Sequence, residues 1–208
     1  MLKKHLTLTG ILIATVLLGI AIRYYPGGSQ KDPSSPGYDW TNNYLSNLFS
    51  PYAFNGMNNS ARLWAIGGVF FMSASFAVFF IQFSTKIAPH SAARVIKYGG
   101  VGATVFSFLT VTPWHDTMII FASILGLVSF FYITVLIFKS RLHALKVFSF
   151  IGLLLAYGCN FIYYTRTNLE WLPVLQKVTL LASILWILAL EYFTEKADFE
   201  FTGLTSKR

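Results

Sequence analysis

The residues of this sequence that are able to carry chemistry are few, and histidine is the most reactive type among them. His115 directly precedes Asp116, and Ser46 supplies a hydroxyl elsewhere in the chain. A serine, a histidine and a carboxylate are the residue types of nucleophile, general base and orienting acid. Ser46, His115 and Asp116 are therefore the candidate catalytic residues, with Asp39 as an alternative acid. No Gly-x-Ser-x-Gly turn accompanies Ser46.

A second kind of chemistry is the binding of a phosphate-bearing headgroup. Arginine suits this role because its planar guanidinium makes paired hydrogen bonds to phosphate. Arg166 and Glu170 also have the spacing of a helical ion pair, which is the simpler interpretation of that arginine. The aromatic residues near these arginines are equally typical of a membrane-interface belt. The candidate headgroup-binding residues are Trp40, Asn43, Arg62, Trp114, His115 and Arg166.

The composition predicts what must position these residues. Of the 208 residues, 55% are hydrophobic and only 12% are charged, which is half the usual charge of a soluble domain. Runs of about 20 apolar residues cross a bilayer as helices, since lipid offers the backbone no hydrogen-bond partners. We therefore expect an all-α membrane protein, with residues 1–208 forming a single domain of six transmembrane helices. The predicted spans are residues 6–22, 63–83, 95–111, 118–138, 147–164 and 174–193.

The distribution of lysine and arginine predicts the orientation of the six spans. Eleven of the 16 basic residues fall on one side, four fall on the other, and Lys177 lies within the last span. Basic residues accumulate in cytoplasmic segments, so both termini are expected in the cytoplasm, at a plasma membrane or a bacterial inner membrane. The larger set is Lys3, Lys4, Lys86, Arg94, Lys97, Lys139, Arg141, Lys146, Lys196, Lys207 and Arg208. The smaller set is Arg23, Lys31, Arg62 and Arg166.

The longest outer segment, residues 26–61, opens with turn-forming prolines and glycines. Trp40, Tyr44, Leu45 and Leu48 then recur at helical spacing, which predicts a short amphipathic helix over the mouth of the bundle. Glycines crowd the second and third spans, and small residues allow close helix approach in lipid. A tight hairpin of these two spans is therefore expected.

The predicted topology also separates the four histidines. His5, His90 and His143 fall on the cytoplasmic side, and His115 falls on the outer side. A zinc site needs three or four clustered ligands, so no metal site is predicted, and no cofactor is expected. Nucleic acid is not expected as a partner despite the net charge of +8, because the basic residues lie in short clusters between apolar runs. The expected partners are membrane lipids, together with other proteins of the membrane.

The topology and two short motifs resemble the Frag/DRAM/Sfk superfamily of six-helix membrane proteins and its bacterial relatives. The motifs are Tyr44-Leu45-Ser46-Asn47 shortly before the second span and Pro113-Trp114-His115 at the start of the fourth. Where that family often has Leu-Ser-Asp-Leu-Gly, this chain has Asn47 in place of the aspartate and Phe49 in place of the glycine. The resemblance implies a role connected with membrane lipids, and its bacterial relatives imply no defined activity.

Three functions follow as hypotheses. The first is a lipid-binding membrane protein that holds a headgroup at its outer face. The second is an intramembrane lipid hydrolase or transferase that uses Ser46 and His115. The third is a structural subunit or scaffold of a membrane complex, which a bundle with few internal polar groups suits.

Overall fold

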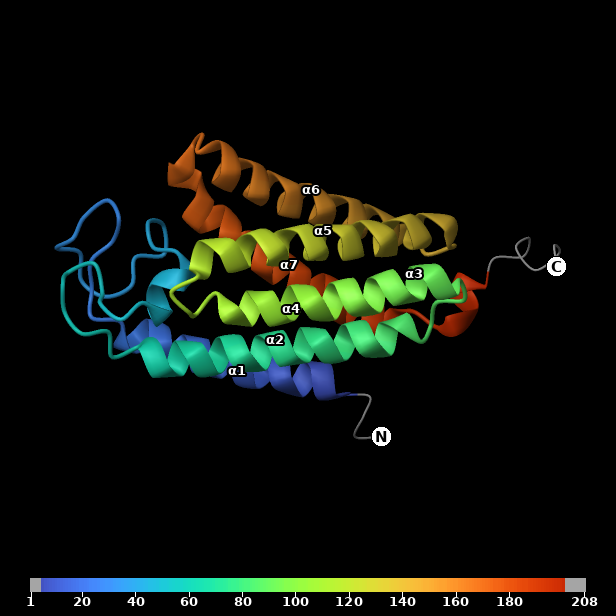
Figure 1. Ribbon diagram of the computed structural model, residues 1–208, viewed down its shortest axis with the longest axis horizontal. Helices are drawn as coiled ribbons and strands as arrows, with labels where there is room; N and C mark the ends of the chain where they lie inside the picture. Colours follow the sequence, from blue (N-terminus) through green and yellow to red (C-terminus); the bar gives the residue numbers. More distant parts are fainter. Residues whose placement is uncertain (1–4, 201–208) are drawn as a thin grey trace.

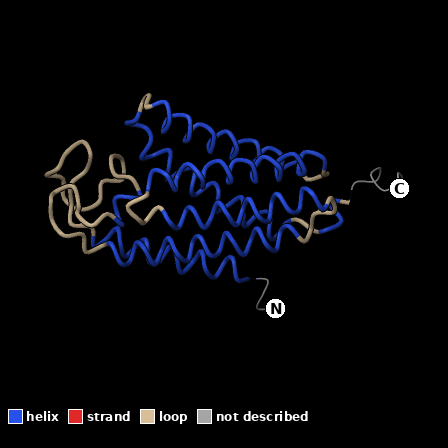
Figure 2. The backbone as a smooth tube through the Cα atoms, viewed as in Figure 1, coloured by secondary structure: helices blue, strands red, loops and turns tan. Residues whose placement is uncertain are grey.

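The computed structural model describes residues 5–200, and this part of the chain is helical with no strand (Figure 2). The long apolar runs form helices because only internally hydrogen-bonded backbone is stable in hydrocarbon. The long helices are α1 (Leu6–Tyr24), α2 (Arg62–Ser84), α5 (His115–Lys139), α6 (His143–Thr165) and α7 (Leu172–Phe193). These five segments, α7 with the short turn before it, are long and apolar enough to cross a membrane, as the sequence predicts for these spans.

The remaining predicted span, residues 95–111, is built from three consecutive pieces. They are α3 (His90–Arg94), a π-helical turn η3 (Val95–Gly99) and α4 (Gly100–Leu109). The helical path therefore starts earlier than predicted, at His90, and is widened by the π turn. Its 20 residues correspond to about 30 Å of helix, the thickness of the hydrocarbon.

The helices lie nearly parallel in an elongated bundle (Figure 1). We call one end the loop end; it carries the segments 25–61, 110–114 and 166–171. The opposite end, which carries 85–97, 139–146 and 194–200, is called the basic end. The predicted short helix of the first loop is observed as the 3-10 helix η2 (Leu45–Phe49), shorter than the spacing from Trp40 suggests. Two further 3-10 turns are η4 (Leu169–Trp171) and η5 (Lys196–Phe199).

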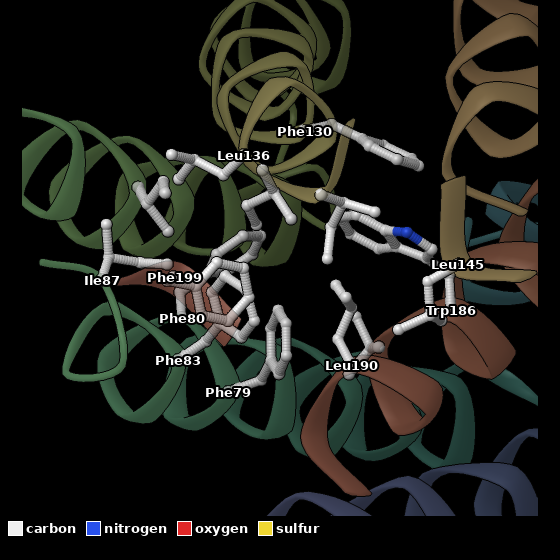
Figure 3. Close-up of a cluster of buried hydrophobic side chains, with 14 of the residues drawn as sticks. Phe79, Phe80, Phe83, Ile87, Phe130, Leu136, Leu145, Trp186, Leu190 and Phe199 are labelled. Atoms are coloured by element: carbon white, nitrogen blue, oxygen red, sulfur yellow. The ribbon is translucent and has the colours of Figure 1, made fainter. Parts of the chain in front are cut away.

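The main core lies in the half of the bundle near the basic end (Figure 3). Trp186 of α7 is its centre: the indole stacks on Phe130 of α5 with ring centroids 3.9 Å apart. The indole Nε1 donates to Ser149 Oγ of α6 at 2.8 Å. On the α2 side, the ring of Phe79 is tilted against the indole at a centroid distance of 6.4 Å and stacks on Phe83. One tryptophan therefore ties four helices together.

The second and third predicted spans pack against each other, as expected, but the glycines of α2 and α4 contact different neighbours. A Cβ at Gly68 would meet Leu18 of α1, so this glycine brings α1 against α2. A Cβ at Gly100 would overlap the ring of Phe80, so only the glycine of α4 serves the α2–α4 contact. The tightest pairing of α2 is accordingly with its predecessor, which lies alongside it in Figure 1.

This contact gives a direct test of the packing. Gly100→Ala is expected to lower the free energy of unfolding by about 1–3 kcal/mol, because the buried Phe80 ring has little room to move. Gly158→Ala in α6 is the matched control, since nothing lies within 4 Å of its Cβ position. We expect that control to be neutral or stabilising by up to about 1 kcal/mol. Thermal unfolding in detergent measures both, and equal effects would contradict the assigned contact.

Candidate functional site

The first loop is held over the bundle by a lysine from the last helix. Lys177 Nζ donates to the Asn43 carbonyl at 2.6 Å and to the Pro173 carbonyl at 2.8 Å. Tyr38 Oη donates to the same Asn43 carbonyl at 3.1 Å, and burial raises the pKa of Tyr38 well above its usual value. Tyr38 therefore keeps its proton and remains a donor at physiological pH.

Asn43 itself is fully buried, with 0% of its surface exposed. Its side-chain Nδ2 donates to the Gly28 carbonyl at 2.9 Å, which ties the start of the loop to its middle. Gly28 has φ +83°, and a Cβ there would meet the backbone of residues 54 and 55, so the close approach requires glycine. Asn43 was expected to contact a headgroup, but the structure gives it an internal role in the loop.

Asp39 begins the single helical turn that leads to Asn43. Its carboxylate accepts from the Asn42 side chain at 2.7 Å, the Thr41 hydroxyl at 2.7 Å and the Thr41 amide at 2.9 Å. The bonds from the Asn42 and Thr41 side chains hold the pKa of Asp39 well below its usual range. The Asp39 carboxylate is thus occupied by hydrogen bonds within this turn, and it stabilises the conformation of the loop.

The helix η2 sits at the mouth of the bundle, between α2 and α7. The Leu45 amide donates to Gln176 Oε1 at 3.0 Å, and Asn59 Nδ2 donates to the carbonyls of Asn47 and Leu48. Phe49 then places its ring 6.2 Å from the ring of His115, centroid to centroid. The first loop and the start of α5 therefore meet at one place.

Four residues join α5 to α6 at the loop end, and we call them the Arg166 cluster: His115, Asp116, Tyr163 and Arg166. His115 Nδ1 lies 2.9 Å from Asp116 Oδ1. Tyr163 Oη donates to the same carboxylate oxygen at 3.0 Å. The guanidinium carbon of Arg166 lies 5.3 Å from the centre of the Tyr163 ring. The Asp116 side chain is 77% exposed and that of His115 is 31% exposed, so the cluster faces outward.

Arg166 has an unusual backbone. Helix α6 ends at Thr165, and Arg166 takes the left-handed conformation with φ +59°. A residue with a side chain pays about 1–2 kcal/mol for this conformation, and glycine usually occupies it. No hydrogen bond or ion pair joins its guanidinium to another residue between 5 and 200. The predicted Arg166–Glu170 ion pair is absent from this described part because the chain turns between the two residues.

The other sequence-predicted residues are placed separately. Ser46 is half-buried in η2, and no hydrogen bond joins it to His115 among the described residues. Trp114 is the exposed residue before α5, and Trp40 packs edge-on against Tyr38. Arg62 is the exposed first residue of α2, and helices α2 and α6 lie on opposite sides of the bundle in Figure 1. The structure therefore brings together His115, Asp116 and Arg166, and it separates Arg62 from them.

The sequence analysis did not identify Tyr163, Gln176 and Lys177 as residues that hold the segments of the loop end together. Tyr163 precedes Arg166 by three residues, a spacing at which helical side chains meet, and that signal was available. Gln176 and Lys177 reach residues far away in sequence, which no local pattern indicates. Within residues 5–200, no three histidine, cysteine or acidic side chains gather to hold a metal ion.

Fold and composition define the class: residues 5–200 form an all-helical structure in which five helices are long and apolar enough to cross a membrane, as in an integral membrane protein. Comparison of the chain with protein-family models, with curated proteins and with solved structures gives no match. The resemblance to the Frag/DRAM/Sfk superfamily stays a prediction from the sequence.

Proposed function

We propose that this protein binds a phospholipid headgroup at its loop end, and that the Arg166 cluster is the binding site. The observation that carries the proposal is the guanidinium of Arg166, which lies on the face of Tyr163 with its donors uncommitted to any described residue. Guanidinium pairs with phosphate oxygens through two parallel hydrogen bonds. The strained backbone at Arg166 supports the proposal, since such strain often accompanies a functional position.

The cluster also offers a negative charge. Asp116 Oδ1 accepts from His115 and Tyr163, whereas no described residue donates to Oδ2. A phosphate beside Arg166 and an ammonium beside Asp116 match the two charges of a zwitterionic headgroup. Phosphatidylethanolamine is therefore the headgroup class that fits best. Exposed aromatic side chains of Trp114, Tyr164 and Trp171 surround this end, as is typical of side chains at the headgroup level.

The proposal places the loop end on the outer side of the membrane. The segments at the basic end carry seven of the 16 lysine and arginine residues, whereas the segments at the loop end carry two. This difference supports a cytoplasmic location for the basic end. We include the 20 residues His90–Leu109 as a sixth crossing, because their length suits the hydrocarbon. Both termini then lie in the cytoplasm.

The test separates binding from stability. Arg166→Gly removes the guanidinium and also relieves the left-handed backbone, so thermal stability is expected to stay equal or rise by about 1 kcal/mol. Retention of phosphatidylethanolamine, measured by native mass spectrometry of the purified protein, is expected to fall. Arg62→Gly in α2 is the matched control for loss of an exposed arginine at the loop end, and it should leave retention unchanged.

Three results would contradict the proposal. Unchanged retention in Arg166→Gly would remove the arginine from any headgroup site. An equal fall in the Arg62→Gly control would show a general effect of charge at this end instead of a site. A large loss of stability in Arg166→Gly would indicate a structural role for the side chain.

The enzymatic alternative retains one specific observation, the 2.9 Å contact of His115 with Asp116. A hydrolase or transferase would require the hydroxyl of Ser46, whereas a headgroup-binding protein would not. Release of a fatty acid or headgroup from phosphatidylethanolamine by the wild type, abolished in Ser46→Ala, would favour the hydrolase over the binding protein.

A further inference from the structure

A cavity of about 420 Å³ opens at the basic end, where α2 ends and the path of α3 and η3 begins. It is separate from the Arg166 cluster, which lies at the other end of the bundle. The lining residues are Ser84, His90, Ala93, Arg94, Lys97 and Tyr98.

The charge of this cavity is uncompensated. Arg94 and Lys97 contribute two cations, and no acidic residue lines the cavity. Neither side chain makes a hydrogen bond or ion pair with another residue in the described range 5–200. The Lys97 ammonium instead lies 5.5 Å from the centre of the Tyr98 ring, a contact that leaves its donors available.

A neighbouring cavity at the same end shows that the acids lie elsewhere. It measures about 310 Å³, and Glu191 and Glu195 line it together with Lys86. Lys86 Nζ donates to the Glu191 carbonyl of α7 at 3.0 Å and to the carbonyl of Thr194, the residue after α7, at 2.8 Å. The smaller cavity is therefore lined by charges of both signs, whereas the charged residues that line the larger cavity are all basic.

The π turn fixes the position of Lys97, and Arg94 is the last residue of α3, directly before the turn. Lys97 and Tyr98 both belong to η3, and the glycines that follow them pin its other face: a Cβ at Gly99 would meet Ser129 Oγ, and one at Gly100 would overlap Phe80. The backbone of the turn is thus held against α5 and α2. Single π turns within helices are frequent at functional sites, and Lys97 and Tyr98 of this turn form part of the cavity wall.

The position of Lys97 along its helix favours a ligand at the membrane interface. Lys97 lies seven residues after the helix start at His90, or about 10 Å along the axis. A lysine at this depth extends toward the phosphate level of the bilayer. Tyr98 beside it is 66% exposed on the bundle surface, where a lipid approaches from the side.

We propose that this cavity binds the phosphate group of an anionic phospholipid from the leaflet at the basic end, with Arg94 and Lys97 as its ligands. A phosphodiester bearing a net negative charge matches two cations without an acid. The inference does not depend on the loop-end site, which is expected to prefer a zwitterionic headgroup. The same chemistry would hold a free phosphate, so the experiment must distinguish the two sources.

The experiment measures lipid retention by native mass spectrometry of the full chain, after equal addition of phosphatidylglycerol or phosphatidylcholine. Wild type is expected to retain phosphatidylglycerol selectively. Arg94→Gln/Lys97→Gln should weaken that retention by about 10-fold or more, since each basic residue near a membrane surface contributes about 1 kcal/mol. Lys139→Gln/Arg141→Gln is the matched control, because it removes two exposed cations from the same end outside the cavity.

Unchanged retention of phosphatidylglycerol in Arg94→Gln/Lys97→Gln, or an equally weakened retention in the control variant, would overturn the proposal. Displacement of the lipid by millimolar inorganic phosphate would also overturn it, because free phosphate would then be the occupant. If the double variant fails to fold, Arg94→Gln alone replaces it, with an expected weakening of about 5-fold. Lys97→Arg keeps the charge and should retain the lipid; loss of binding in that folded variant would also count against the proposal.

Discussion

Trp186→Ala is expected to cost about 3–5 kcal/mol of unfolding free energy, the largest effect of any single substitution considered for this protein. The indole is 2% exposed, and it stacks on Phe130 at 3.9 Å. Its removal leaves a void between α5, α6 and α7 whose walls lose their contacts. It also leaves the hydroxyl of Ser149 without its donor. Chemical unfolding in detergent micelles measures the change.

Two variants accompany this test. Trp171→Ala is the matched control, since that indole is 66% exposed at the loop end, and it should change stability by less than about 0.5 kcal/mol. Trp186→Phe keeps an aromatic ring and loses the hydrogen bond, so an intermediate loss of about 1–2 kcal/mol is expected. A Trp186→Ala protein within about 1 kcal/mol of wild type would contradict the assigned core.

Lys177→Met is expected to release the first loop from the bundle. The lysine donates to the Asn43 and Pro173 carbonyls, and charge-assisted hydrogen bonds contribute about 1.5–3 kcal/mol each. Removing a half-buried cation also relieves its desolvation cost, so the global unfolding free energy should change little. The loss is expected locally, as an increase of about 10-fold or more in hydrogen exchange over residues 38–48.

Lys146→Met is the control for Lys177→Met. Lys146 is also half-buried, lies at the opposite end, and makes no side-chain hydrogen bond to another described residue. Exchange over residues 38–48 should stay at the wild-type rate in this variant. The same slow rate in Lys177→Met would show that the lysine does not hold the loop.

The spanning helices were predictable because hydropathy and helix length are tied by the thickness of the bilayer. The observed helices extend one to four residues beyond several predicted spans, as α5 does at His115 and α6 at His143. Polar residues at these ends can continue a helix in the interface, where water is available, so apolar runs underestimate helix length. The π turn at Val95–Gly99 was not predictable, since it depends on how Gly99 and Gly100 meet α5 and α2.

The site was predictable only in part. Topology assigns His115, Asp116 and Arg166 to one end, and the structure joins them through Tyr163. Sequence could not show that Arg62 lies apart from them, because lateral order in a bundle follows from side-chain packing. Asn43 illustrates a related limit: a polar residue in a long outer segment is expected to be exposed, and only the folded loop reveals its burial.

The cavity at the basic end illustrates the same limit. Arg94 and Lys97 were interpreted from the sequence as part of the charge bias that sets orientation. The structure adds that they share a cavity free of acids. An orientation signal and a binding site are compatible roles, and only the three-dimensional structure shows which basic residues share a cavity.

The measurement that tests the proposed function most directly is photo-crosslinking of phosphatidylethanolamine carrying a photoreactive headgroup to the wild-type protein in nanodiscs. Crosslinked peptides identified by mass spectrometry are expected to contain Trp114–Met118 and Tyr163–Trp171, and Arg166→Gly should remove this labelling. Labelling spread evenly over both ends of the bundle, or confined to the basic end, would contradict a headgroup site at the Arg166 cluster.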